Sequence, residues 1–128
     1  MHMTSAIHTD IIRMIRETML PQTVIPKPRS KNRFIVKTWG MRKKEIALIY
    51  LIPNNKNPAN PYQKGITESE FGKSYSRLME TGTFSHQWFK EHLLRCAGEG
   101  SCNFTTIGGI FEKLRLAKYE KPGLYKKI

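Results

Sequence analysis

The chain has 128 residues, of which 22 are Lys or Arg and 10 are Asp or Glu, so its formal net charge is +12. Hydrophobic residues make up 39% of the sequence, which is enough for a folded core and excludes a wholly disordered chain. No apolar run reaches the roughly 18–20 residues of a membrane span, and two cysteines do not make a disulfide framework, so we expect a soluble cytoplasmic protein of prokaryotic type with no membrane partner.

The first predicted element is an amphipathic helix that begins at Thr4 or Ser5 and runs to about Met19. Apolar side chains recur at helical spacing from Ile7 onward, and either hydroxyl can cap the first turn. Pro21 ends the helix. Its apolar stripe also offers a surface through which the chain can form a homodimer.

The next segment, QTVIPKPRSKNR, is predicted to be an extended basic arm. Two prolines exclude a helix, and they alternate with four cations: Lys27, Arg29, Lys31 and Arg33. Residues 21–56 as a whole carry nine basic side chains and one acid, Glu45. Because a basic surface attracts phosphates and binding releases their counterions, the arm is predicted to contact nucleic acid.

Two strand candidates follow, RFIVKTWG and KEIALIYLIP, both rich in β-branched and aromatic residues. Residues 40–43 are predicted to connect them as a hairpin, and residues 54–65 to form a loop. Strand alternation divides the first candidate into two faces, Phe34, Val36 and Thr38 against Ile35, Lys37 and Trp39. An exposed second face would stack on unpaired bases, so RNA or single-strand binding by this hairpin is the alternative function.

From Thr67 onward the apolar spacing becomes helical. Thr67 and Glu70 are predicted to form a capping box, and Gly82 to stop that helix. A second helix is predicted after Ser85 and a third from Asn103, which gives three helices in residues 67–116. Their inner faces share large apolar side chains: Trp88, Phe89, Phe104, Ile107, Phe111 and Leu114.

The end of the chain is predicted to be a β-hairpin, because AKYE and LYKKI alternate in period two around Pro122 and Gly123. We therefore expect an α+β fold in one compact structure. Residues 1–65 supply the N-terminal helix, the basic arm and a β-hairpin, and residues 66–128 supply the three-helix unit with its own hairpin.

The order helix, short strand, helix, turn, helix, hairpin resembles the winged helix-turn-helix superfamily over residues 66–128. The matching stretches are ESEFGKSYSRLM, TFSHQWFKEHLLRC, NFTTIGGIFEKLRL and AKYEKPGLYKK. The resemblance implies duplex DNA binding, in which the third helix reads base edges and the hairpin is the wing. By position, the reading face is Thr105, Thr106, Gly109, Glu112 and Lys113, and the wing is Lys118, Lys121, Tyr125, Lys126 and Lys127.

This reading face departs from the Arg, Asn and Gln that the family usually presents, so modest sequence specificity is expected. The stretch from TGTFSHQWF through CNFTTIGGIFEKL is also similar to small uncharacterised proteins encoded on mobile elements, such as integron gene cassettes and phages. A further alternative is accordingly a protein-interaction module of a mobile-element accessory protein.

Gly108 and Gly109 interrupt the apolar run of the third predicted helix. Each mid-helix glycine costs about 0.5–1 kcal/mol relative to alanine, so a specific reason is needed. Gly108 flanks the apolar stripe, which predicts close packing against a large side chain such as Trp88. Gly109 lies nearer the outer face, and either packing or the close approach of a nucleic acid explains it.

No enzymatic activity, cofactor or metal is expected. The basic segment has one acid, Glu45, whereas a metal nuclease needs clustered carboxylates. His92 and Cys96 have a spacing that suits zinc, but His86 and Cys102 do not provide the second close pair that structural zinc sites use. The sequence leaves open whether the two cysteines are free, bridged or metal-bound.

Overall fold

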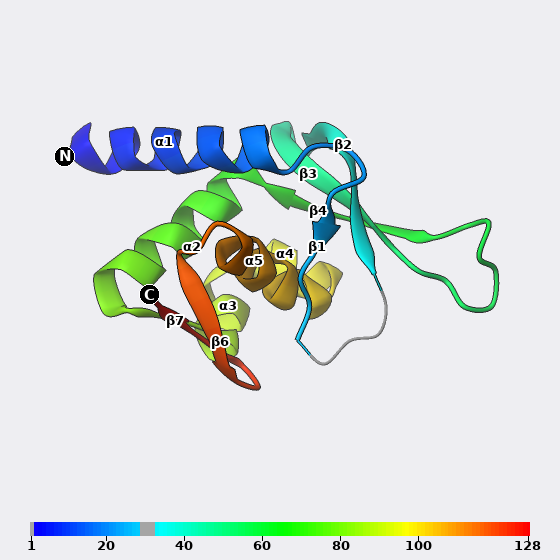
Figure 1. The fold of residues 1–128 in the computed structure, drawn as a ribbon. Coiled ribbons are helices and arrows are strands. Elements are labelled where there is room, and N and C mark those ends of the chain that lie inside the picture. Colours follow the sequence, from blue (N-terminus) through cyan, green and yellow to red (C-terminus); the bar gives the residue numbers. More distant parts are fainter. Residues whose placement is uncertain (1, 29–32) are drawn as a thin grey trace.

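Two antiparallel sheets and five helices make up the computed structural model of this protein, which describes residues 2–28 and 33–128 (Figure 1). The first sheet has the order β1 (Val24–Ile25), β2 (Phe34–Arg42), β3 (Glu45–Ile52), β4 (Tyr62–Thr67). The second has the order β5 (Thr83–Ser85), β7 (Leu124–Lys127), β6 (Ala117–Lys121). The helices are α1 (His2–Thr18), α2 (Glu68–Thr81), α3 (His86–His92), α4 (Leu94–Glu99) and α5 (Cys102–Lys113). The predicted α+β class is confirmed.

Helix α5 lies at the centre of the fold, in contact with β1 and β4 of the first sheet and with β6 of the second (Figure 1). Phe104, Ile107 and Phe111 of this helix are buried, and the same hydrophobic cluster includes residues from both halves of the sequence. Trp88 and Leu114 are only half-buried, so they line the core rather than form its centre.

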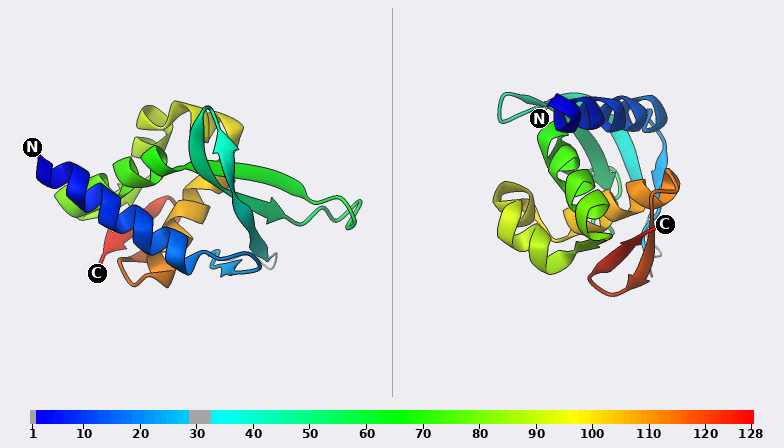
Figure 2. Two further views of the ribbon diagram at one scale, coloured as in Figure 1. Left: turned by 90° about the horizontal axis from the view of Figure 1, so that it is seen from above. Right: turned by 90° about the vertical axis from the view of Figure 1, so that its left-hand side faces the viewer.

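Helix α1 packs across α2 on one side of the molecule, and the β3–β4 connection projects from the other end (Figure 2). Ile11, Ile15 and Met19 of the predicted stripe are buried, whereas Met14 and Leu20 are exposed. The buried part of the stripe therefore packs into the hydrophobic core of the same chain. A homodimer through this helix stays a prediction. In the part of the chain that the structure describes, no helix has the length and apolar character to cross a bilayer.

Four short-range signals in the C-terminal half are confirmed: the capping box at Thr67, the stop at Gly82, the cap at Ser85 and the turn at Pro122 and Gly123. The Thr67 hydroxyl accepts from the backbone N–H of Glu70 at 3.3 Å, and the Glu70 carboxylate accepts from the N–H of Thr67 at 2.9 Å. Gly82 ends α2 with a φ of 79°, and the Ser85 hydroxyl caps α3 through the N–H of Trp88. The C-terminal hairpin turns at Pro122 and Gly123, as expected.

Three predicted boundaries are wrong. The β2–β3 turn consists of Lys43 and Lys44, whose φ angles of 51° and 64° suit a two-residue hairpin turn, and not of residues 40–43. The end of the predicted loop is strand β4, which pairs Ile66 with Leu48 of β3. The predicted second helix is interrupted at Leu93, with φ −117° and ψ 64°, so residues 67–116 contain four helices rather than three.

Asn103 is not a helix cap. It lies inside α5, fully buried, where its Nδ2 donates to the carbonyl of Cys96 at 2.9 Å and its Oδ1 accepts from the hydroxyl of Tyr50. The asparagine thus joins α5 to α4 and to β3. Its hydrogen-bonding capacity is used in the core, where an unpaired amide would be costly.

A β-bulge in β2 reverses the faces that strand alternation predicts. Val36 pairs with Tyr50 and Thr38 pairs with Ile49, so Lys37 is the extra residue. Trp39 therefore turns to the core side, where its ring lies 6.4 Å from that of Phe71 and its Nε1 donates to the carbonyl of Met19 at 3.1 Å. Trp39 is not part of an exposed stacking face with Lys37.

Candidate nucleic-acid interface

The basic arm begins on the inside of the fold. The ammonium of Lys27 donates to the carbonyl of Cys102 at 3.0 Å and to the hydroxyl of Thr106 at 2.9 Å, and it lies 4.0 Å from the ring centroid of Phe34. Burial lowers the pKa of Lys27 from 10.5 to about 7. In this arrangement Lys27 binds α5 rather than a phosphate. Arg33 is exposed, and Arg29 and Lys31 lie outside the described residues.

Two of the five residues of the predicted reading face of α5 are covered by this arm. Thr106 and Gly109 are buried, and a side chain on Gly109 would meet the carbonyl oxygen of Pro26. The prediction that these two residues face DNA is therefore wrong, because β1 and the residues after it pack on them. Thr105 is half-buried, and Lys113 is exposed at the end of the helix.

Both glycines of α5 are explained by packing. A Cβ on Gly108 would lie within 3.0 Å of the ring of Tyr125, and a Cβ on Gly109 within 3.0 Å of the Pro26 oxygen. Tyr125 comes from β7 and Pro26 from the arm, so the helix is approached closely from two sides. The close partner of Gly108 is Tyr125 and not Trp88, the partner suggested by the sequence.

The C-terminal hairpin carries a group of exposed cations. Its four lysines, Lys118, Lys121, Lys126 and Lys127, are all exposed. Lys118 and Lys126 are direct partners across β6 and β7, on the face opposite the buried Tyr125. Glu120 forms an ion pair with Lys126 at 3.0 Å. A hollow of about 540 Å³ lies along this hairpin, lined by Lys118, Lys126 and Lys127 among others.

A second hollow, a groove of about 370 Å³, lies where the hairpin meets the starts of two helices. The residues that line it come from four segments: Pro28 of the arm, His86 of α3, Ser101, Phe104 and Thr105 around the start of α5, and Tyr119, Pro122 and Gly123 of the hairpin. The backbone N–H of Tyr119 donates to the carboxylate of Glu112 at 2.9 Å, which holds β6 against α5. Thr105 is thus the one residue of the predicted reading face that lines this groove.

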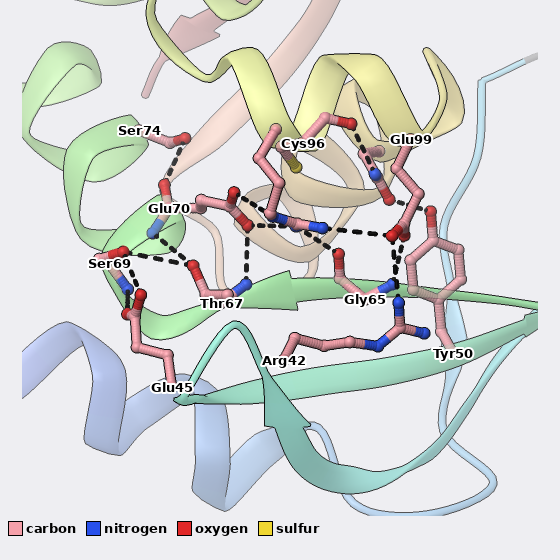
Figure 3. Close-up of polar contacts among 12 residues, drawn as sticks. Arg42, Glu45, Tyr50, Gly65, Thr67, Ser69, Glu70, Ser74, Cys96 and Glu99 are labelled. Carbon is pink, nitrogen blue, oxygen red and sulfur yellow. Dashed lines mark hydrogen bonds and ion pairs between the residues drawn. The ribbon is translucent and has the colours of Figure 1, made fainter.

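A network of partly buried ion pairs joins several elements of the fold, and it was not predicted from the sequence (Figure 3). Arg95 of α4 donates to both carboxylate oxygens of Glu70, at 2.6 and 2.8 Å, and to the carbonyl of Gly65 at 2.8 Å. Glu99 accepts from Arg95 at 3.2 Å and from Arg42 at 3.1 Å. The network therefore connects β2, β4, α2 and α4.

These ion pairs also leave fewer carboxylates on the surface to balance its positive charge. Burial opposes the charged form of Glu70, but hydrogen bonds from Arg95 and Thr67 outweigh it and lower the pKa of Glu70. Glu70 and Glu99 are thereby neutralised by internal arginines. The carboxylates available to neutralise the exposed lysines are correspondingly fewer.

The cysteines are free thiols. Cys96 is buried, and this burial raises its pKa, whereas Cys102 is half-buried. Among residues 2–28 and 33–128, no three His, Cys, Asp or Glu side chains come together in a group that would hold a metal ion.

Comparison with known proteins gives no relative for this arrangement. The chain matches no protein-family model, no curated protein and no solved structure.

Proposed function

We propose that this protein binds nucleic acid, duplex DNA before other forms, through phosphate contacts on its C-terminal hairpin. The observation that carries the proposal is the pair Lys118 and Lys126, which stand directly opposite each other on an exposed face of the hairpin. Like charges in this relation repel each other, Glu120 compensates Lys126 only through one exposed ion pair, and a bound polyanion reduces the repulsion further. Lys121 and Lys127 add two more cations to the same hairpin.

We also propose that residues 66–128 form a winged helix-turn-helix unit. The supporting observations are the element order α2, β5, α3, α4, α5, β6, β7 and the sheet order β5, β7, β6, in which a short strand joins the terminal hairpin. In this proposal the hairpin is the wing and α5 is the third helix, with an added break at Leu93.

The proposed binding is largely independent of sequence. Lysine side chains on phosphates position a duplex without reading its bases. The face of α5 that holds Thr106 and Gly109 is covered by the arm, and the half-buried Glu112 accepts a hydrogen bond from the N–H of Tyr119. Of the predicted reading face, Thr105 and Lys113 remain for contact with a duplex. The salt dependence of the affinity should therefore be strong, and the preference between duplex sequences weak.

Fluorescence anisotropy titrations with a labelled duplex, at several salt concentrations, test this proposal. The double substitution Lys118→Gln and Lys126→Gln should weaken binding and reduce the slope of log affinity against log salt by about 0.9 for each lost contact. The matched control removes the same charge from two exposed lysines elsewhere, Lys56 in the β3–β4 loop and Lys73 on α2. Equal effects of both double variants would mean that the hairpin is not the binding surface.

The alternatives are separated by the same titrations with single-stranded DNA and RNA. If single strands bind more tightly than the duplex at every salt concentration, the alternative function is favoured, which is RNA or single-strand binding by the central hairpin. If no nucleic acid binds at low salt, the protein-interaction module is favoured instead.

A further inference from the structure

The groove of about 370 Å³ between the hairpin and the start of α5 is not used by the proposed phosphate contacts. Its volume lies in the range of small-molecule sites, roughly 300–1,000 Å³, which suits one planar group and not a duplex. Of the described residues that line it, none carries a carboxylate. No carboxylate of this lining would therefore repel a negatively charged ligand.

Two half-buried rings line the groove, and each is held in place by a buried ring behind it. The centroid of His86 lies 5.2 Å from that of Phe104, at an interplanar angle of 82°. The centroid of Tyr119 lies 5.5 Å from that of Tyr125, at 68°. Rings fixed in this way are suited to stacking, because little conformational freedom is lost when a planar ligand binds.

The polar groups of the groove suit a heterocycle rather than a purely apolar ligand. Ser101 and Thr105 contribute hydroxyl groups, and the Thr105 hydroxyl donates to the carbonyl of Cys102 at 3.1 Å, which leaves its oxygen as an acceptor. Burial, followed by the charge of Lys90, lowers the pKa of His86, so its imidazole is neutral at pH 7 and offers one donor and one acceptor.

Two lysines neighbour residues that line the groove. Lys90 is close enough to His86 to influence its titration, and Lys121 directly precedes Pro122 at the turn of the hairpin. Both lysines are exposed. Planar stacking surfaces with cations beside them are the combination by which proteins hold single strands.

We infer that this groove binds one unpaired nucleobase, stacked against Tyr119 and His86, of a strand whose phosphates contact Lys90 and Lys121. The inference rests on the proposed function and adds to it a preference for DNA that has unpaired bases at its end. A duplex that ends in a single-stranded overhang should bind more tightly than a blunt duplex of the same sequence.

The test compares two labelled duplexes with overhangs of equal length, one with normal bases and one in which the overhang is abasic. Both carry the same phosphates, so a difference in affinity comes from the bases alone. The overhang with bases should bind about fivefold or more tightly, the value expected when one base stacks on an aromatic side chain. The difference should fall below about twofold in Tyr119→Leu and, separately, in His86→Ala, which alters the other ring of the groove.

Tyr62→Leu is the matched control, since Tyr62 is an exposed tyrosine on β4 and is not among the residues of the groove. It should retain the full difference, and circular dichroism should show that all three variants are folded. If duplexes bind with the expected salt slope but the abasic overhang binds as well as the normal one, the groove inference is overturned and the proposed function stands. Loss of the difference in Tyr62→Leu as well would also overturn it. If no DNA binds at low salt, the proposed function fails and the groove inference fails with it.

Discussion

The carbonyl oxygen of Pro26 lies within 3.0 Å of the position where a side chain on Gly109 would begin. Only glycine at position 109 lets the arm lie this close to α5. The two residues are far apart in the sequence, and the arm covers Gly109 and Thr106, two residues of the helix face that the sequence had indicated as a DNA-reading surface.

Gly109→Ala should destabilise the protein. Alanine favours a helix by about 0.5–1 kcal/mol over glycine, but its methyl group would meet the backbone of Pro26, which cannot move aside as a flexible side chain can. Overpacking of this kind costs typically 1–3 kcal/mol, so a net loss is expected in a urea denaturation. Gly98→Ala in α4 is the matched control, because a Cβ there meets no atom within 4 Å, and it should leave the stability unchanged or raise it.

Lys27→Met should change how stability depends on pH. The pKa of Lys27 is about 7 in the folded protein and near 10.5 when the chain is unfolded, so between these values only the unfolded chain binds the proton. The free energy of unfolding should therefore rise with pH from about 7 to 10.5, by up to about 1.4 kcal/mol per pH unit from this group. Urea denaturation of the wild type and Lys27→Met from pH 6.5 to 9.5 should show a smaller rise in the variant. An exposed control, Lys73→Met, should retain the wild-type rise, and an equal rise in Lys27→Met would contradict the buried ammonium.

Arg95→Met should be among the costly substitutions of a polar residue. It leaves the carboxylates of Glu70 and Glu99 without their shared partner, and removal of one member of a largely buried pair costs roughly 3–5 kcal/mol, less here because Arg95 is partly exposed. Arg13→Met, which breaks an exposed pair with Asp10, should cost less than about 1 kcal/mol in the same denaturation experiment.

The same ion-pair network should make the stability of the protein depend on pH in the acid range. Because the folded pKa of Glu70 is lowered, its contribution to stability is present above the pKa of the unfolded carboxyl, near 4.5, and is lost as the pH falls through the lowered value. The wild type should therefore lose more stability than Arg95→Met between pH 5 and pH 2. A parallel loss in the two proteins would indicate that the Arg95–Glu70 pair does not set the titration of Glu70.

The two thiols should react at different rates. Cys102 is half-buried and Cys96 is fully buried with a raised pKa, so iodoacetamide should modify Cys102 first and Cys96 only when the protein unfolds. Mass spectrometry at increasing times should show one alkylated thiol in native conditions and two in denaturant. Rapid alkylation of Cys96 in the native protein would show that α4 does not protect it.

Features that depend on neighbours within a few residues could be predicted from the sequence alone. The capping box of Thr67 and Glu70, the stop at Gly82 and the turn at Pro122 and Gly123 are set by side chains and backbone angles of one short segment. Their physical causes are local hydrogen bonds and allowed φ values, so they can be predicted without a partner. The α+β class followed from the same local signals.

The contacts that each of these elements makes depend on long-range packing and could not be predicted in this way. The bulge at Lys37 is set by the pairing of β2 with β3, and this shift of one residue turns Trp39 into the core. Strand β4 becomes a strand by pairing with β3, although Pro61 and Gly65 within its neighbourhood are typical of loops. Lys27 meets Thr106, and Arg95 meets Glu70, across long stretches of chain. Burial and charge pairing between distant segments depend on how the sheets and helices pack, and periodicity along the chain carries no information about that packing.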